Sequence, residues 1–249
     1  MNRVFITGDK HRNFDSVEYF CSRMDTDKSD LIIVLGDNGV NWYDDKRDDD
    51  FKKFLSDLPV KFMMIRGNHD MRPQNIHKHY STGVYQDVAL TNAAVNGKFL
   101  VQDEYPDLLF AKDGCSYNFN NNLSAFVIGG AHSIDKRLRL ENGYPWFEDE
   151  QLNQSEMIAA SRRYSDWLQN NKSRKKIMLT HTCPYRFIPR ENLLPWPTPE
   201  DEDYTMERWF DSLYEIGKNK LSDWYCGHWH ICKKDGNVRF MYDDFWRIL

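Results

Sequence analysis

Aspartate, asparagine and histidine side chains recur along this sequence directly after short apolar runs. They are Asp9 and His11, then Asp37, then Asn68, His69 and Asp70, then His181, and finally His228 and His230. Leaving out His69 and Asp70, they would supply two carboxylates, four imidazoles and one amide oxygen. This donor set is too large for one four-coordinate ion and suits two cations. Mixed oxygen and nitrogen donors without thiolate favour manganese, iron, zinc or nickel over a soft metal, and we expect manganese first.

The elements that must position these side chains can be predicted from the apolar runs themselves. Strands are predicted at 3–7, Leu31–Leu35, 60–65, 176–179 and 224–226, and one of the polar groups follows shortly after the end of each. In an open α/β sheet the ligand crevice lies outside the carboxyl ends of the strands. We therefore expect all five groups to meet at one rim.

The remaining pattern predicts an α/β fold. Apolar residues with helical spacing over 13–24 and 44–58 alternate with the first three strands, which indicates βαβ units and a parallel sheet. The longest predicted helix covers 148–170. Meandering β structure is predicted at 99–102, Leu108–Ala111, 116–119 and 125–128. Residues 184–204 are rich in proline, which interrupts helices and central strands, so a long surface loop is predicted there.

Composition and charge exclude several classes of protein. The 249 residues are 41% hydrophobic and 14% aromatic, which is enough for a sizeable core, and we expect one domain over 1–249. The 33 basic and 38 acidic residues give a net charge of −5, which makes a nucleic-acid partner unexpected because phosphate contacts need a basic surface. No apolar run approaches the roughly 18 residues of a membrane span, so no membrane partner is expected.

The cysteines and the N-terminal sequence indicate a cytoplasmic protein. The 5 cysteines are odd in number and lack a C-x-x-C pair, so they are predicted to be reduced thiols. The N-terminal sequence enters a predicted strand at once and has no signal-peptide core.

In their order, the motifs resemble those of the calcineurin-like metallophosphoesterase superfamily, in its bacterial or phage-type members. The motifs are G-D-x-H, G-D-N, G-N-H-D, a lone histidine after a strand and G-H-x-H, and they extend from Gly8 to His230. The resemblance implies a four-layer α/β/β/α sandwich of two mixed β-sheets flanked by helices, with a dinuclear metal centre at the rim.

The same resemblance implies a role for each matching residue. One metal would be held by Asp9, His11 and His230, and the other by Asn68, His181 and His228. Asp37 would bridge the two ions. His69 corresponds to the non-ligand histidine of the family, which lies near the leaving group.

This set predicts a dinuclear-metal-dependent phosphoesterase that acts on phosphomonoesters or phosphodiesters. Two cations ~3.5–4 Å apart lower the pKa of a bridging water and clamp the attacking and leaving oxygens, so in-line attack by the bridging hydroxide is expected. Asp37 and His69 are the predicted catalytic residues. Protonated His69 would stabilise the developing charge or protonate the leaving alkoxide.

The sequence departs from one branch of the superfamily in its second motif. Protein Ser/Thr phosphatases continue this motif as G-D-x-V-D-R-G, where the second aspartate pairs with the catalytic histidine and the arginine grips phosphate. Here Val40 and Asn41 stand at those two positions, so a protein phosphatase of that type is disfavoured.

Three residues are predicted to contact the substrate, namely Asn68, His132 and Arg186. His132 lies in Gly-Gly-Ala-His-Ser-Ile-Asp-Lys, a segment that resembles one in bacterial and phage-type members. Arg186 and Arg190 lie in the proline-rich segment that begins three residues after His181, where a guanidinium could meet a phosphate.

Two other functions stay open at this stage. A nuclease would use the same metals on nucleic acid, and a non-catalytic binding scaffold could share the fold. A small phosphoester is the expected substrate, but the sequence leaves open its identity, the preference for monoesters or diesters, the native metal, the oligomeric state and the role of the 184–204 loop.

Overall fold

The computed structural model describes residues 3–76, 85–91, 94–119, 122–170, 174–192 and 203–249. Within these residues, one seven-stranded sheet has the order β13-β1-β2-β3-β6-β5-β4. Its parallel centre consists of β1 (Val4–Thr7), β2 (Leu31–Leu35), β3 (Lys61–Ile65) and β6 (Leu108–Ala111). Antiparallel pairing adds β13 (Trp246–Arg247) at one side, and β5 (Gly97–Val101) with β4 (Gln86–Leu90) at the other.

A six-stranded sheet with the order β11-β12-β10-β9-β8-β7 faces the first. Its parallel strands are β8 (Leu123–Ile128), β9 (Lys175–Thr180), β10 (Asp223–Cys226) and β12 (Val238–Phe240). The outer strands β7 (Cys115–Asn118) and β11 (Lys233–Asp235) pair antiparallel with their neighbours. Both sheets are therefore mixed, as the sequence predicted.

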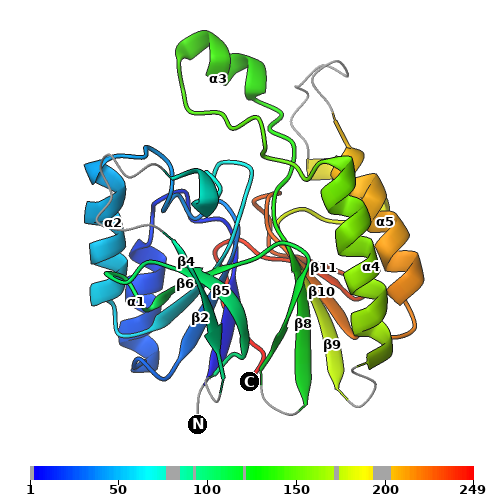
Figure 1. Cartoon of the computed structure of the whole chain (residues 1–249), viewed down its shortest axis with the longest axis horizontal. Coiled ribbons are helices and arrows are strands. Elements are labelled where there is room, and N and C mark those ends of the chain that lie inside the picture. Colours follow the sequence, from blue (N-terminus) through cyan, green and yellow to red (C-terminus); the bar gives the residue numbers. More distant parts are fainter. Residues whose placement is uncertain (1–2, 77–84, 92–93, 120–121, 171–173, 193–202) are drawn as a thin grey trace.

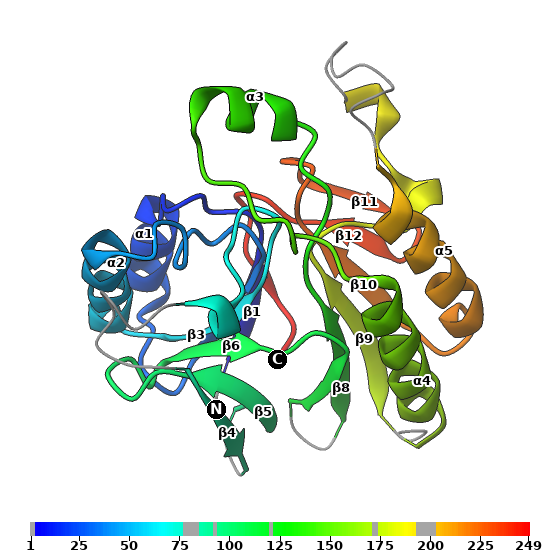
Figure 2. The same ribbon diagram turned by 45° about the horizontal axis from the view of Figure 1, so that its top comes forward.

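Helices cover the outer faces of both sheets (Figures 1 and 2). The first sheet carries α1 (Asp15–Met24) and α2 (Lys46–Asp57), and the second carries α4 (Gln154–Asn170) and α5 (Thr205–Gly217). The predicted class of two mixed sheets flanked by helices is confirmed.

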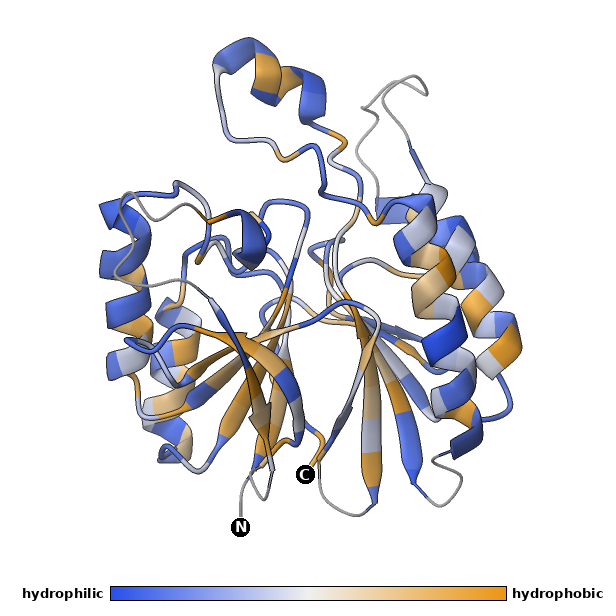
Figure 3. Ribbon diagram, viewed as in Figure 1, coloured by the Kyte–Doolittle hydropathy of each residue, from blue (hydrophilic) through white to orange (hydrophobic). Residues whose placement is uncertain are grey.

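Strand β2 shows how the sequence builds these layers. Successive side chains of a strand point to opposite faces. Ile33 and Leu35 accordingly join the apolar cluster between the two sheets, whereas Ile32 and Val34 pack with residues of α1 and α2. All five residues of β2 are buried, and the apolar strands stand out in the hydropathy view (Figure 3). Each buried aliphatic side chain contributes about 1.5–3 kcal/mol, so the strand position is strongly determined.

The long predicted helix begins later than expected. The sequence predicted 148–170, but α4 begins at Gln154. Asn153 stops the helix from extending back: its Oδ1 accepts the backbone N–H of Glu156 at 3.0 Å, and Glu156 Oε2 accepts the backbone N–H of Asn153 at 2.8 Å. This reciprocal capping box marks the helix start.

Several elements have no counterpart in the sequence prediction. They are α3 (Lys136–Asn142), α5, β4, β11, β12 and β13, together with the short 3-10 helices η1 (Pro73–Asn75), η2 (Tyr185–Phe187) and η3 (Arg190–Asn192). The last two lie in the predicted 184–204 loop, of which 193–202 are outside the described residues. In the described part of the chain, no helix is long and apolar enough to cross a membrane.

The start of β1 and the last residues of the chain meet at the edge of the molecule away from the carboxyl ends of the parallel strands (Figure 1). The backbone N–H of Val4, where β1 begins, donates to the carbonyl oxygen of Leu249 at 3.4 Å, and Ile248 donates to the carbonyl oxygen of Val4 at 2.9 Å. The opposite edge carries the loops that leave the strands, and the candidate site lies there.

A buried glutamate anchors α5 to one of these loops. Glu207 is only 2% exposed, and its Oε1 accepts the hydroxyl of Thr182 at 2.7 Å. Its Oε2 has no hydrogen-bond partner among the described residues. Burial raises the pKa of Glu207 to about 7, although the hydrogen bond from Thr182 lowers it. Because Thr182 follows His181 in the sequence, the contact helps to position a predicted ligand.

The raised pKa of Glu207 predicts a pH-dependent stability. The folded protein keeps this proton up to about pH 7, whereas the unfolded chain loses it near 4.5. The free energy of unfolding therefore falls as pH rises between these values, by roughly 3 kcal/mol, and stays lower above them. In urea unfolding, the free energy of unfolding of Glu207→Gln minus that of the wild type should increase by roughly 3 kcal/mol between about pH 4.5 and pH 8.

The exposed Glu141 provides a control. Glu141→Gln should keep a constant difference from the wild type over the same range of pH. Parallel pH curves for Glu207→Gln and the wild type would contradict the raised pKa.

Candidate metal centre

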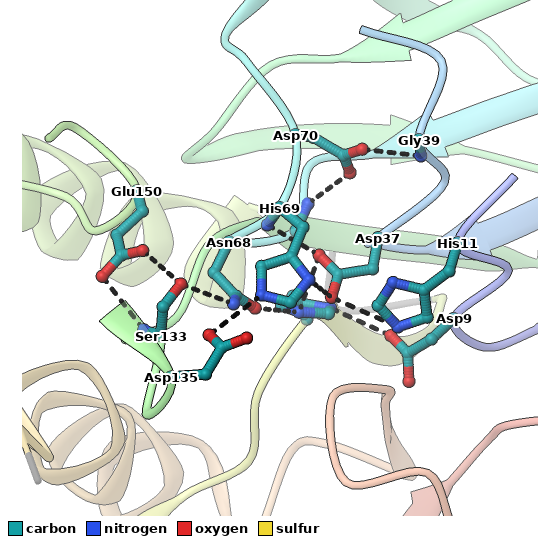
Figure 4. A network of polar contacts seen from close by, with 12 residues as sticks. Asp9, His11, Asp37, Gly39, Asn68, His69, Asp70, Ser133, Asp135 and Glu150 are labelled. Atoms are coloured by element: carbon teal, nitrogen blue, oxygen red, sulfur yellow. Dashed lines mark hydrogen bonds and ion pairs between the residues drawn. The ribbon is translucent and has the colours of Figure 1, made fainter. Parts of the chain in front are cut away.

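The loops after β1, β2, β3, β9 and β10 bring most of the predicted ligands together (Figure 4). Asp37 lies at the centre. Its Oδ1 is 3.5 Å from Nε2 of His181, and its Oδ2 is 3.6 Å from Nε2 of His11 and 3.4 Å from Nδ1 of His69. Among the described residues, two groups of side chains could hold a metal ion, and Asp37 belongs to both. Within each group, the potential ligand atoms all lie within 4.8 Å of one another. One adds His11 and His69, and the other adds Asp9 and His181.

In Asn68 and His181, two hydrogen-bond acceptor atoms point toward each other. Nδ2 of Asn68 donates to Oγ of Ser133 at 2.9 Å, which leaves Oδ1 directed at Nε2 of His181, 2.8 Å away. Nδ1 of His181 lies 2.8 Å from the carbonyl oxygen of Leu35, so this nitrogen carries the proton. Burial lowers the pKa of His181 and favours the neutral ring. Two lone pairs thus meet without a proton between them, which is an arrangement that a cation could satisfy.

Asp9 is a buried carboxylate without hydrogen bonds. The residue is 2% exposed, and neither of its carboxylate oxygens has a hydrogen-bond partner among the described residues. Burial raises its pKa, and the charge of Asp37 raises it further. The rings of His181 and His230 approach these oxygens at 3.4 and 4.0 Å. A buried carboxylate with so little compensation is costly, so its oxygens are suited to a metal ion.

The G-H-x-H motif supplies two more rings. Nε2 of His230 is 3.0 Å from Nε2 of His11 and 4.0 Å from Oδ2 of Asp9. The ring of His228 packs against that of His181, with centroids 5.0 Å apart. Burial lowers the pKa of His11 to about 4 and also lowers those of His228 and His230. The rings are therefore neutral near pH 7, as metal ligation requires.

The backbone is strained at four of these residues. The φ angles of His11, Asp37, His228 and His230 are 42°, 43°, 69° and 49°, in the left-handed region that side chains rarely adopt. Such conformations cost of order 1–3 kcal/mol each and persist where the surrounding structure enforces them, often at functional sites. Strain at four candidate ligands of one cluster therefore supports a functional role for the cluster.

Two glycines leave room for this cluster. A Cβ atom on Gly67 would lie 2.0 Å from Oδ1 of Asp37, and one on Gly36 would lie 2.1 Å from Nδ1 of His181. Only glycine allows the backbone to approach these side chains so closely.

A row of hydrogen bonds orients Asn68 from behind. Ser133 accepts from Asn68 and in turn donates to Glu150, which also accepts the backbone N–H of Ser133 at 3.0 Å. Glu150 lies 3.4 Å from Nδ1 of His132, so His132 belongs to the surroundings of the cluster. Partners of this kind fix the direction in which a ligand atom points.

His69 is held between Asp37 and Asp135. Its backbone N–H donates to Oδ1 of Asp37 at 2.9 Å, and its Nε2 lies 3.6 Å from Oδ1 of Asp135. Burial alone lowers the pKa of His69, but the charge of Asp37 and the contact with Asp135 outweigh burial and raise it. Asp70, next in sequence, accepts backbone N–H groups of Gly67 and Gly39 at 2.8 Å and supports the loop.

Among the described residues, Arg186 forms ion pairs with side chains of α5 and with none of the predicted metal ligands. Its guanidinium pairs with Asp211 and Glu215 and lies over the ring of Tyr214, all of them on α5. These two carboxylates already neutralise its charge. The contacts give no support to the predicted role of Arg186 in substrate binding, which stays a prediction.

Comparison with protein families decides the membership of the chain. The model of the family described as calcineurin-like phosphoesterase matches residues 2–232. The chain belongs to this family. The phosphoesterase is therefore a metal-dependent phosphoester hydrolase, in agreement with its cluster of aspartate and histidine side chains. The recognition made from the motifs is confirmed.

Solved structures show the same fold at low sequence identity. TT1561 of Thermus thermophilus is 14% identical, with a TM-score of 0.52 over 97% of this chain and 88% of that chain. The phosphopantetheinyl hydrolase PptH from Mycobacterium tuberculosis is 14% identical, with a TM-score of 0.50 over the same shares. Comparison with curated proteins gave no significant match.

The orphaned oxygens of Asp9 predict how metal affects stability. In excess chelator, the phosphoesterase variant Asp9→Asn should unfold at or above the temperature of the wild type, because it removes an unpaired buried carboxylate. Adding manganese at about 100 times its Kd should stabilise the wild type by about 2.7 kcal/mol, or roughly 5–10 °C, and the variant by much less. Thermal unfolding followed by circular dichroism measures both effects.

The exposed Asp50 is the matched control for Asp9. Asp50→Asn should respond to manganese as the wild type does. Equal manganese stabilisation of Asp9→Asn and the wild type would show that Asp9 is not a ligand.

Proposed function

We propose that the phosphoesterase hydrolyses small phosphomonoesters or phosphodiesters with two divalent cations that share Asp37. The observation that carries this proposal is the position of Asp37, whose Oδ1 lies 3.5 Å from Nε2 of His181 and whose Oδ2 lies 3.6 Å from Nε2 of His11. A carboxylate with one oxygen toward each of these two rings is suited to bridging. Net charge of −5 favours a small substrate over a nucleic acid.

The remaining ligands divide between the two sides of Asp37. Asp9, His11 and His230 would hold one cation, supported by the contacts of His230 with His11 and Asp9. Asn68, His181 and His228 would hold the other, supported by the facing acceptors of Asn68 and His181. We expect manganese, with iron, zinc or nickel as alternatives, because the donors are oxygen and imidazole nitrogen.

Bound cations of this kind supply a nucleophile at neutral pH and neutralise the oxygens of the transferred phosphoryl group. The protein's own contribution to the chemistry is a proton. Burial lowers the pKa of His69, while Asp37 and Asp135 raise it, and Nε2 of its ring faces Oδ1 of Asp135 at 3.6 Å. A protonated His69 at this place can donate to the departing oxygen of the substrate.

The thiols support the proposed cytoplasmic location. All five cysteines are free, and Cys21, Cys183 and Cys226 are buried. We propose that the protein acts in a reducing compartment.

Hydrolysis of p-nitrophenyl phosphate and of bis(p-nitrophenyl) phosphate tests the proposed activity. Turnover of at least one substrate should require added manganese, nickel or zinc, and should stop when a chelator is added. The ratio of the two rates distinguishes monoesterase from diesterase activity. Digestion of linear DNA and RNA under the same conditions, with little turnover of either small ester, would indicate a nuclease instead.

His69 should be needed for turnover and not for metal binding. His69→Ala is expected to lower kcat by about 100-fold to 10,000-fold, the usual contribution of general acid–base catalysis, while elemental analysis still finds two metal ions per chain. Loss of one ion in this variant would make His69 a ligand and contradict its assigned role.

A further inference from the structure

A segment outside the two sheets reaches over the metal centre. Residues 133–144, here called the α3 arm, leave β8, form α3 and return toward α4, and they stand above the rim in Figures 1 and 2. Ser133 at its base contacts Asn68, and Asp135 contacts His69 (Figure 4). The arm therefore approaches the site at two points.

We propose that Arg139 of the α3 arm binds the phosphate group of the substrate, and that Asp135 positions both Arg139 and His69 for this purpose. The inference rests on the proposed phosphoesterase function of the site. It adds a substrate-binding residue and a positioning residue that lie outside the metal-ligand motifs.

The contacts of Arg139 direct its guanidinium to the site. Nε donates to Oδ2 of Asp135 at 2.8 Å and Nη1 donates to the carbonyl oxygen of Pro145 at 3.3 Å, while Nη2 lies 3.3 Å from Nδ1 of His69. Nδ1 of His69 is in turn 3.4 Å from Oδ2 of Asp37. Arg139 thus lies one side chain away from the carboxylate proposed to bridge the cations.

The low exposure of the Arg139 side chain is not a consequence of core packing. None of the residues of α3 is classed as buried, and Leu138 and Leu140 beside Arg139 are 42% and 56% exposed. The side chain of Arg139 itself is only 12% exposed and lies over the ring of Trp42, with its guanidinium carbon 5.3 Å from the ring centroid. Its contacts with Asp135, Pro145 and Trp42 hold this long side chain toward His69.

The charges of the site favour an anion between Arg139 and the metals. Two divalent cations with Asp9, Asp37 and a bridging hydroxide would leave one positive charge, and the charge of Arg139 is offset by Asp135. A phosphate fits between the two, because its oxygens can bind the cations on one side and the planar N–H fork of an arginine on the other. In phosphoryl transfer, charge on these oxygens is stabilised by such a cation.

The second motif supplies no charged side chain from Asn38 to Asn41. Val40 is fully buried in the apolar cluster under α1 and α2, and Asn41 is 1% exposed and accepts the hydroxyl of Tyr85 at 2.9 Å. Asp135 and Arg139 supply a carboxylate and a guanidinium from another part of the chain.

Phosphate binding tests the role of Arg139 directly. Calorimetric titration of the manganese-loaded protein with inorganic phosphate should give a Kd about 10-fold to 100-fold weaker for Arg139→Ala than for the wild type. The Kd of Arg139→Lys for phosphate should lie between those of the wild type and Arg139→Ala, because an ammonium keeps the charge but lacks the bidentate fork. Arg137→Ala removes the same charge from an exposed position of α3 and should bind phosphate as the wild type does.

Turnover of p-nitrophenyl phosphate gives a second readout. Arg139→Ala should lower kcat/KM by a similar factor with an unchanged metal content, and added guanidinium ion should restore part of the activity. Arg137→Ala should show neither effect. Because α3 buries no residue, these substitutions leave the core intact, and circular dichroism can check this.

The leaving-group dependence tests the positioning role of Asp135. Asp135→Asn should lower kcat for phenyl phosphate at least 10-fold more than for p-nitrophenyl phosphate, because p-nitrophenolate departs without a proton and depends less on His69. Equal losses for both substrates would assign Asp135 a structural role only and overturn this part of the inference.

The two proposals fail in different ways. If the wild type hydrolyses phosphoesters but Arg139→Ala binds phosphate and turns over substrate as the wild type does, the role of Arg139 is wrong and the phosphoesterase function stands. If the wild type hydrolyses no phosphoester but its phosphate affinity still depends on Arg139 and not on Arg137, the proposed activity is wrong and the anion site stands.

Discussion

The structure depends on a concentration of electron-rich atoms at the rim of the two sheets, where Asp9, Asp37 and His181 are buried. Asp9 and Asp37 belong to one group of atoms within 4.8 Å. At such a separation two carboxylates repel each other by roughly 3 kcal/mol for an effective dielectric constant of about 20. The surrounding imidazoles are kept neutral by burial and offer lone pairs instead of protons. Folding therefore creates a deficit of positive charge that divalent ions could fill.

The sheets supply the rigidity that this arrangement requires. Leu31–Leu35 is buried on both faces, so the position of Asp37 is set by two apolar layers rather than by its own loop. The left-handed backbone at Asp37 and His11 costs free energy that the packed strands can supply. The polar contacts around Asn68 then set the direction of its oxygen. Stability is thus concentrated in the strands and strain is concentrated at their ends.

The meeting of these aspartate and histidine side chains at one rim could be predicted from the sequence because both signals are local: an apolar run marks each strand, and the polar residues follow it. The α3 arm could not be predicted, because no residue of α3 is classed as buried and Arg139 is indistinguishable in the sequence from an ordinary solvated arginine. Helix α5 did carry a signal in the spacing of Met206, Phe210 and Leu213, all buried on one face. The start of α4 was misplaced because apolar spacing does not detect a cap, which Asn153 provides. Contacts between distant segments, such as that of Asp135 with His69, require the fold itself.

The meeting of Val4 and Leu249 at the far edge of the sheets has a practical consequence for handling the protein. A fusion partner or a surface linker attached at Leu249 would start at the edge opposite the candidate site. Because Val4 and Leu249 are adjacent in space, a short peptide could also connect the two ends of the chain, and new ends could be cut in an exposed loop. The molecule could then be tethered or circularly permuted while the reactive edge stays free.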